Sequence, residues 1–233
     1  MPPDLHYGPS FYVYLCGQGR FGRDVLEMLL RRPEVLVTGV SAPPAGPSGR
    51  EDRLWGAAEL RGIARMPAGS LRAGTLPAGT DLIIAAHSHD FLGRRTRDAS
   101  RLGAIGYHPS LLPLHRGRDA VRWAVRDRDR VTGGTVFWLN DTVDGGPVAA
   151  QDWCFTRPGE DARALWRRDL FPMGLRLIES VLDDILRGVL VRVPQDHALA
   201  TWEPPMDSPP LFRPELPELG DGASRGYQVV ASR

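Results

Sequence analysis

Short apolar runs that alternate with segments of helical spacing most constrain the fold of this chain. FYVYLC at 11–16 is rich in aromatic and β-branched residues, and it leads through GQGRFG into DVLEMLLRR, whose apolar residues have helical spacing. Further runs of strand type follow at 35–41, 81–86 and 104–108, with a helical pattern at 91–101. Strands that alternate with helices pair in parallel, so this order predicts an α/β fold with a Rossmann-like, mostly parallel sheet flanked by helices.

The second half of the chain adds an antiparallel pair and a long helix. Residues 118–127 have the apolar spacing of a helix, and TGGTVFWLN and GPVAAQDWCF flank a turn like the two arms of a hairpin. The sheet is therefore predicted to be mixed. Apolar positions between residues 160 and 186 predict a long helix that bends at Pro172 and ends at Gly188.

The composition fits one domain followed by an irregular end. A chain of 233 residues, 42% of them hydrophobic, can bury one sizeable core without a metal or a disulfide. We expect the α/β domain to span residues 1–201. The segment 202–233 is rich in proline and has no periodicity, which predicts a tail that wraps the surface or stays mobile.

The charged residues exclude several classes of function. The formal net charge is +1 and no long run of like charge occurs, which argues against binding to nucleic acid or to an anionic membrane. All 29 basic residues are arginine. Because lysine is absent, Schiff-base chemistry, pyridoxal chemistry and a P-loop nucleotide site are excluded. Small molecules are therefore the expected partners, and an oligomer is compatible with the sequence.

The sequence predicts a cytoplasmic protein. Cys16 and Cys154 lie in separate apolar segments without a metal or disulfide spacing, which fits a reducing compartment. The first ten residues lack the basic and apolar regions of a signal peptide, and no apolar run reaches the length of a membrane span.

The glycine-rich turn after the first strand raises the question of a dinucleotide. Gly17, Gly19 and Gly22 satisfy GxGxxG between a strand and a helix. A nicotinamide site also needs an acidic residue at the end of the second strand, and residues 36–46 contain none. The turn then predicts close packing of helix and strand, with backbone amides at the helix N-terminus available to an anionic ligand.

A rigid loop follows the strand at 104–108. In GYHPSLLPLHRG, residues 106–117, two prolines exclude a helix and interrupt a sheet ladder. Gly106 and His108 should share one face of the sheet, while Tyr107 faces the opposite layer. His108 thus stands at the carboxyl end of a parallel strand, where open α/β sheets bind ligands. Asp144 in VDGGPV is a candidate partner, because a nearby carboxylate raises the basicity of a histidine.

Two of these motifs together resemble a known family. HPSLLP at 108–113, followed by TGGTVFWLNDTVDGGPV at 132–148, is similar to the folate-dependent formyltransferases, which include the glycinamide ribonucleotide and methionyl-tRNA enzymes. The likeness runs from about Tyr12 to Leu190, and the glycine-rich turn and the tail match poorly.

The resemblance implies an activity and a set of site residues. An amine would attack the formyl carbon of 10-formyltetrahydrofolate, with His108 as general acid and base and Asp144 in support. Folate would be held by the proline loop and by the end of the strand at 81–86. The implied folate-binding residues are Ser110, Leu111, Leu112, Pro113, His87, Ser88 and His89.

One residue departs from the family pattern. Family members carry asparagine two positions before the histidine, where its amide hydrogen-bonds to the formyl oxygen, and this chain has Gly106. Loss of one oxyanion donor typically costs about 10²–10³ in rate. We expect either a replacement donor among residues 87–89 or low activity. A folate-binding or regulatory module without turnover is the alternative.

A metal centre is a further possibility that the sequence leaves open. His87 and His89, with His108 or Asp144, could form a zinc or iron centre, which would make the protein a metal-dependent enzyme.

The acceptor is predicted to be a small amine, such as an amino sugar or an amino acid derivative. The part of the chain after Leu190 is rich in proline and nearly neutral, which argues against tRNA. Gly17, Gly19 and Arg20 are the candidate contacts for an anionic group of this acceptor.

Overall fold

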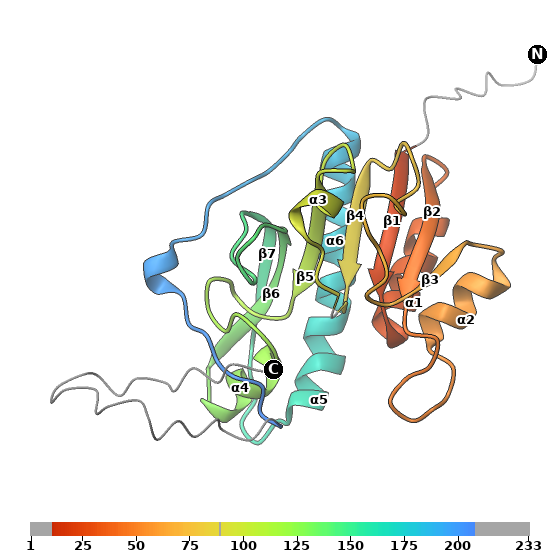
Figure 1. Ribbon diagram of the computed structural model, residues 1–233. Helices are drawn as coiled ribbons and strands as arrows, with labels where there is room; N and C mark the ends of the chain where they lie inside the picture. Colours follow the sequence, from red (N-terminus) through yellow and green to blue (C-terminus); the bar gives the residue numbers. More distant parts are fainter. Residues whose placement is uncertain (1–10, 89, 208–233) are drawn as a thin grey trace, which may run out of the picture.

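The computed structural model describes residues 11–88 and 90–207, and its centre is one seven-stranded sheet (Figure 1). The strand order is β3-β2-β1-β4-β5-β6-β7. The strands are β1 (Phe11–Gly17), β2 (Val35–Ala42), β3 (Arg65–Pro67), β4 (Leu82–Ala86), β5 (Ala104–His108), β6 (Val131–Trp138) and β7 (Val148–Phe155). The first five pair in parallel and the last two are antiparallel. The predicted mixed α/β sheet is confirmed.

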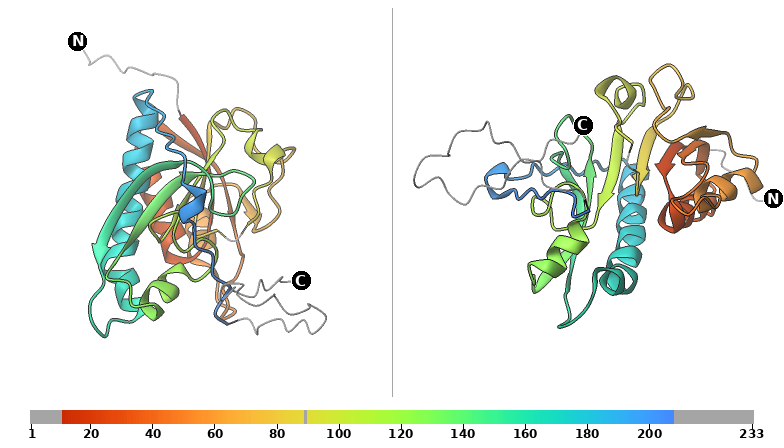
Figure 2. Two further views of the ribbon diagram at one scale, coloured as in Figure 1. Left: turned by 90° about the vertical axis from the view of Figure 1, so that its left-hand side faces the viewer. Right: turned by 60° about the horizontal axis from the view of Figure 1, so that its bottom comes forward.

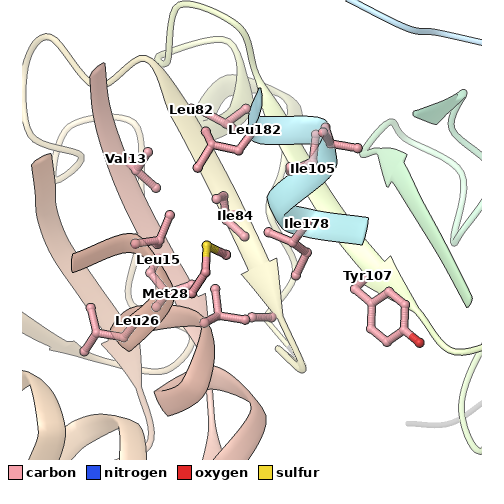
Figure 3. Close-up of a cluster of buried hydrophobic side chains, with 14 of the residues drawn as sticks. Val13, Leu15, Leu26, Met28, Leu82, Ile84, Ile105, Tyr107, Ile178 and Leu182 are labelled. Atoms are coloured by element: carbon pink, nitrogen blue, oxygen red, sulfur yellow. The ribbon is translucent and has the colours of Figure 1, made fainter. Parts of the chain in front are cut away.

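Three helices cover one face of this sheet. They are α1 (Gly19–Leu30), α2 (Arg53–Leu60) and α6 (Phe171–Leu186). Alternate strand residues, such as Val13 and Ile84, pack against Ile178 and Leu182 of α6 in the main core (Figure 3). Burial of such side chains contributes about 1.5–3 kcal/mol each, so this layer dominates the stability of the fold.

Tyr107 shows how the strand β5 divides its residues between the two faces. It belongs to the helix-side core, and its hydroxyl donates to the carbonyl of Leu170 at 2.7 Å. Burial raises the pKa of this hydroxyl. The predicted alternation is confirmed, because Gly106 and His108 lie on the opposite face. On that face a smaller core gathers Tyr14, Cys16, Leu71, Leu76, Ile83, Leu92 and Ala104.

The helix predicted at 91–101 is much shorter in the structure. Only α3 (Arg94–Arg97) is helical, with Gly93 at its N-cap. The hydroxyl of Ser100 accounts for the early end, because it donates to the carbonyls of Arg97 and Gly103 and so turns the chain toward β5. The helix predicted at 118–127 is found as α4 (Ala120–Arg126).

The long helix predicted from 160 to 186 is present with an irregular centre. It begins as α5 (Ala162–Leu165), passes through a π-helical stretch at Trp166–Leu170 and continues as α6. Pro172 follows soon after the π-helical stretch, and its ring nitrogen has no hydrogen to donate to the carbonyls of that stretch. The helix α2 and the short strand β3 had no counterpart in the sequence prediction.

After α6 the chain returns along the sheet to its carboxyl-terminal edge (Figures 1 and 2). Val193 pairs with Val148, and Trp202 pairs with Arg116, so residues up to 207 pack on the domain. The predicted tail from 208 onward lies outside the described residues. Within the described ranges, no helix has the length and apolar character needed to cross a membrane.

Candidate active site

His108 ends strand β5 and is 7% exposed. Its Nε2 lies 2.7 Å from the carbonyl oxygen of His115, at the far end of the proline loop. Because a carbonyl only accepts, Nε2 carries the proton and donates it in this contact. The other ring nitrogen, Nδ1, therefore has a free lone pair in neutral His108. The loop geometry thus fixes which nitrogen can take up a proton.

Asp144 lies in the turn between β6 and β7, with a positive φ of 47°. Its Oδ2 is 3.7 Å from Nδ1 of His108 and also accepts the backbone amide of Gly117 at 2.8 Å. The separation from Nδ1 is too long for a hydrogen bond but short enough for a strong charge interaction with a protonated ring. The structure therefore brings together the two side chains that the sequence singled out. Their chemical roles stay predictions.

The proline loop is held by its own polar groups. Ser110 is fully buried, and its hydroxyl donates to the carbonyl of Leu114 at 2.6 Å. The hydroxyl of Thr135 donates to the carbonyl of Ser110 and accepts the amide of Leu112. The Leu112–Pro113 peptide bond is cis. The side chains of Ser110 and Leu112 are thus buried, and they offer no exposed surface for the predicted contacts with folate.

Leu111 and Pro113 are half-buried and form the outer side of this loop. One terminal methyl of Leu111 lies over strand β6, 2.7 Å from the point where a side chain on Gly133 would begin. Glycine at that position therefore makes room for the leucine. Of the four loop residues predicted to bind folate, these two remain accessible.

Gly106, at the position of the family asparagine, faces apolar neighbours. A Cβ atom placed on it would lie 3.0 Å from Cδ1 of Leu139 and 3.5 Å from Cε1 of Phe137. The third neighbour is the Cβ of Ala85. No side-chain donor occurs among these three contacts.

The candidate replacement donors lie at the end of β4. His87 is exposed with a positive φ of 58°, and its ring centroid is 6.3 Å from that of Trp166. Trp166 packs on the helix-side core, whereas Gly106 faces the other side of the sheet. Ser88 accepts the amide of Asp90 at 3.1 Å. His89 lies outside the described residues, so the replacement donor stays a prediction.

The metal centre considered from the sequence includes His89, which lies outside the described residues, so this centre stays a prediction. Among the residues that the structure describes, His87, His108 and Asp144 are absent from the groups of three or more ligand atoms close enough to share an ion. Of the described members, His108 and Asp144 face each other, while His87 lies near Trp166.

The glycine-rich turn is closed by a carboxylate of the chain itself. The amide of Gly19 donates to Oδ2 of the buried Asp52 at 2.8 Å. A Cβ on Gly17 would lie 2.5 Å from the carbonyl oxygen of Ala86, so this glycine permits close packing of two strand ends. The predicted anion contact at the amide of Gly19 is therefore occupied by Asp52.

Arg20, the remaining predicted contact of the acceptor, is exposed beside α6. Its guanidinium lies 5.3 Å from the ring centre of Phe171 and its Nε lies 3.4 Å from Asp24. Both partners hold it against the outer surface of α1. Neither contact brings Arg20 to His108 or Asp144.

Two buried residues that the sequence analysis did not identify, Arg116 and Gln195, lie beside the site. Arg116 donates to the side-chain oxygen of Gln195 at 2.6 Å and to Nδ1 of His197 at 3.0 Å. The amide of Gln195 donates to the carbonyls of Asp144 and Gly146, so it holds the aspartate turn in place.

The Arg116 guanidinium combines burial with a nearby carboxylate. Burial lowers its pKa, and the Asp144 charge opposes that shift. Arg116 lies within the loop sequence at 106–117, so its charge near two prolines was a usable signal. Gln195 comes from a distant and irregular part of the chain, and nothing in its sequence neighbourhood marked it.

Comparison with known proteins gives matches over most of the chain. A family model described as "Formyl transferase" matches residues 70–179. The mitochondrial 10-formyltetrahydrofolate dehydrogenase of Mus musculus is 32% identical over 209 residues, which cover 85% of this chain and 22% of that protein. A methionyl-tRNA formyltransferase of Methylacidiphilum infernorum is 28% identical over 200 residues, 82% of this chain and 62% of that protein. The chain thus spans about a fifth of the length of the dehydrogenases.

Solved structures share the fold. Glycinamide ribonucleotide transformylase 1 from Symbiobacterium toebii superposes with a TM-score of 0.69 at 21% identity, covering 82% of this chain and 97% of that one. An N-formyltransferase from Helicobacter canadensis, solved with folinic acid and dTDP-3-aminofucose, gives a TM-score of 0.68 at 13% identity, with coverage of 83% and 70%.

Proposed function

We infer the function from a premise that these matches establish: the chain belongs to the folate-dependent formyltransferase family. We propose that it transfers the formyl group of 10-formyltetrahydrofolate to the amine of a small-molecule acceptor. His108 acts as general acid and base, and Asp144 supports it. The observation that carries this proposal is the 3.7 Å approach of Asp144 Oδ2 to the free ring nitrogen of His108.

The residues account for the movement of one proton. The folate supplies the formyl group, a new carbon–nitrogen bond forms to the amine, and the bond to the folate nitrogen breaks. His108 takes the proton of the attacking amine at Nδ1, because Nε2 already donates to the carbonyl of His115. Asp144 stabilises the positive ring while it holds this proton. His108 then gives the proton to the folate nitrogen as that nitrogen leaves.

The chain offers a surface of the right kind for folate beside this pair. Leu111 and Pro113 are the half-buried residues of a loop whose interior hydrogen bonds already fix its shape. A flat, edge-polar pterin suits an apolar, stiff surface of this kind. The Helicobacter canadensis enzyme of the same fold was solved with folinic acid, which supports a folate as the ligand of this chain.

The closed glycine-rich turn bears on the acceptor. Asp52 already accepts the amide of Gly19, so this donor is not available to a phosphate of the acceptor. We therefore propose an acceptor amine that presents no phosphate to the N-terminus of α1. An amino sugar or an amino acid derivative without a phosphate at this point meets that condition.

A folate-binding module without turnover is the second candidate, and one observation favours it. The three atoms nearest to a Cβ placed on Gly106 belong to Leu139, Phe137 and Ala85, and none of these atoms can donate a hydrogen bond to the formyl oxygen. A missing donor costs about 10²–10³ in rate.

The two candidates differ in what happens to bound folate. The full chain is incubated with 10-formyltetrahydrofolate and a panel of small amines, and release of tetrahydrofolate is measured together with the formylated product. Calorimetry with 5-formyltetrahydrofolate measures binding separately. Transfer that depends on His108, with binding unchanged in His108→Gln, is the expected result. Binding without formyl loss favours the module, and absence of folate binding contradicts both.

A further inference from the structure

A second cluster of ionisable side chains lies on the other side of the proline loop. His115, Asp127 and Glu203 each offer one ligand atom, and these atoms lie within 4.8 Å of one another. The same three residues line a cavity of about 490 Å³. Formyl transfer as proposed above uses none of these side chains.

Two of the three side chains are buried with polar atoms left without a partner. His115 is 7% exposed and Glu203 is 6% exposed. Nδ1 of His115 and Oε2 of Glu203 have no hydrogen-bond partner among the described residues. A buried polar atom without a partner typically costs about 1–3 kcal/mol, so an arrangement with two of them at one place calls for a ligand.

The orientation of His115 makes its free nitrogen a ligand atom. Its Nε2 lies 2.7 Å from Oδ2 of Asp129, so that nitrogen donates its proton to the carboxylate. Nδ1 is thereby left with its lone pair toward the cavity. Metal-binding histidines show this same pattern, in which a carboxylate holds the other ring nitrogen and fixes the ring.

Nδ1 and the nearest carboxylate oxygen are close together without bonding. The distance from Nδ1 of His115 to Oε1 of Glu203 is 3.1 Å, yet the two atoms are not aligned for a hydrogen bond. Two ligands of one metal ion, each about 2.0–2.2 Å from it, are separated by a distance of this size. A shared cation between them satisfies both atoms, and Asp127 then supplies a third ligand atom.

We propose that His115 Nδ1, Glu203 and Asp127 form a binding site for a divalent transition-metal ion, with Zn²⁺ as the best match to one imidazole and two carboxylates. Asp129 is a positioning residue, because it acts through the ring of His115. The cavity is lined by the carboxylates of Asp127, Asp129 and Glu203 and by one basic side chain, that of Arg130. The charged side chains therefore give the site a net negative charge. That balance favours a cation over an anion.

The site joins two segments that are far apart in the sequence. His115 belongs to the proline loop, and its backbone amide donates to the hydroxyl of Thr201, two residues before Glu203. A metal bound by both segments would clamp the returning chain onto the loop. The carbonyl of His115 also accepts the hydrogen bond of His108. A metal ion bound at His115 would therefore be linked to the active site through this contact.

The test is metal binding by the full chain, measured without reference to formyl transfer. Protein purified without a histidine tag is depleted with a chelator and titrated with Zn²⁺ by calorimetry, and with Co²⁺ by absorption spectroscopy. We expect one saturable site per chain and a melting temperature that rises with added Zn²⁺. Glu203→Gln and Asp127→Asn, which keep side-chain shape, should each lose this site, and Asp129→Asn should weaken it about 10–100-fold.

The matched control is Asp98→Asn, which removes an exposed carboxylate from a different part of the surface. It should bind Zn²⁺ like the parent protein. The near-ultraviolet circular dichroism of each variant shows whether it is folded, so loss of binding is read only from folded protein. Absence of saturable binding in the parent chain, or binding that survives in both Glu203→Gln and Asp127→Asn, would overturn the proposal.

Discussion

Two aspartates beside the carboxyl ends of parallel strands differ in what surrounds them. Asp52, next to the glycine-rich turn, accepts hydrogen bonds from the backbone amides of Gly19, Leu54 and Trp55. Both of its oxygens are engaged, and it is buried. The carboxylate joins the N-termini of α1 and α2, and its negative charge is matched by their dipoles.

Asp144 has fewer partners. Its Oδ2 accepts one backbone amide, that of Gly117, and faces the ring of His108 at 3.7 Å. The comparison indicates that a carboxylate at this edge of the sheet has a structural role when both of its oxygens accept backbone amides, as those of Asp52 do. Asp144, which faces the ring of His108 and lies near the Arg116 guanidinium, is the carboxylate that we propose for chemistry.

The largest expected effect is on the rate of formyl transfer when each of these two aspartates is replaced by asparagine, which has nearly the same shape. Asp144→Asn should lower formyl transfer by about 10²–10⁴-fold, because the charge that supports a protonated His108 is lost. Steady-state rates with the acceptor found in the amine panel measure this. Asp52→Asn is the matched control and should keep the rate of the parent protein. Equal losses of activity in both variants would break the comparison.

The next prediction concerns position 106, where an asparagine would introduce a side-chain hydrogen-bond donor beside His108. Gly106→Asn should raise formyl transfer by about 10²-fold, provided that the side chain of Leu139 moves by a few tenths of an ångström. The double variant with Leu139→Ala removes that contact and shows whether crowding limits the gain. Rates and melting temperatures are measured for both. An unchanged rate in two folded variants would mean that another donor already serves the formyl oxygen.

Removal of the structural carboxylate should act on stability. Asp52→Ala leaves three backbone amides without their acceptor and should lower the free energy of unfolding by about 2–3 kcal/mol. Urea unfolding measures it. Asp196→Ala, which removes an exposed cap that accepts a single amide, should cost well under half of that. A large rise in the KM of the acceptor for Asp52→Ala, with little loss of stability, would assign the turn to substrate binding.

The smallest expected effect concerns the backbone of the same turn. Gly19 has a φ of +62° with open space around its Cα, so Gly19→Ala should cost about 1 kcal/mol through backbone strain alone. Gly74→Ala has equally open space without a positive φ and serves as the control. Urea unfolding distinguishes the two. A loss of activity in folded Gly19→Ala would contradict a purely structural role.

The sheet was the most predictable part of the fold. Its strands β1, β2, β4 and β5 follow apolar runs that are recognisable from the sequence, and their residues alternate between two buried faces. The strand β3 and the helix α2 were missed, because three residues carry little periodicity and α2 has only two fully buried positions. The helix predicted at 91–101 was wrong in length, since local hydrogen bonds of Ser100 decide where it ends.

The candidate site was predictable only in part. A strand-end histidine and an aspartate turn were visible as motifs, and Arg116 lay beside them. The closure of the glycine-rich turn by Asp52 was not, because that contact joins residues 33 positions apart. Gln195 and Glu203 return to the site from an irregular segment whose path no local pattern specifies.

The sequence by itself determined the alternation of the strands β1, β2, β4 and β5 with helices, the face on which His108 stands and the resemblance to the formyltransferases, because these follow from periodicity and from short motifs. The tertiary structure alone decided which polar groups meet: Asp144 with His108, Asp52 with Gly19, and Glu203 with His115. The physical reason is distance. Hydrogen bonds and charge interactions act over a few ångströms, and only packing of the whole chain brings residues so far apart in sequence within that range.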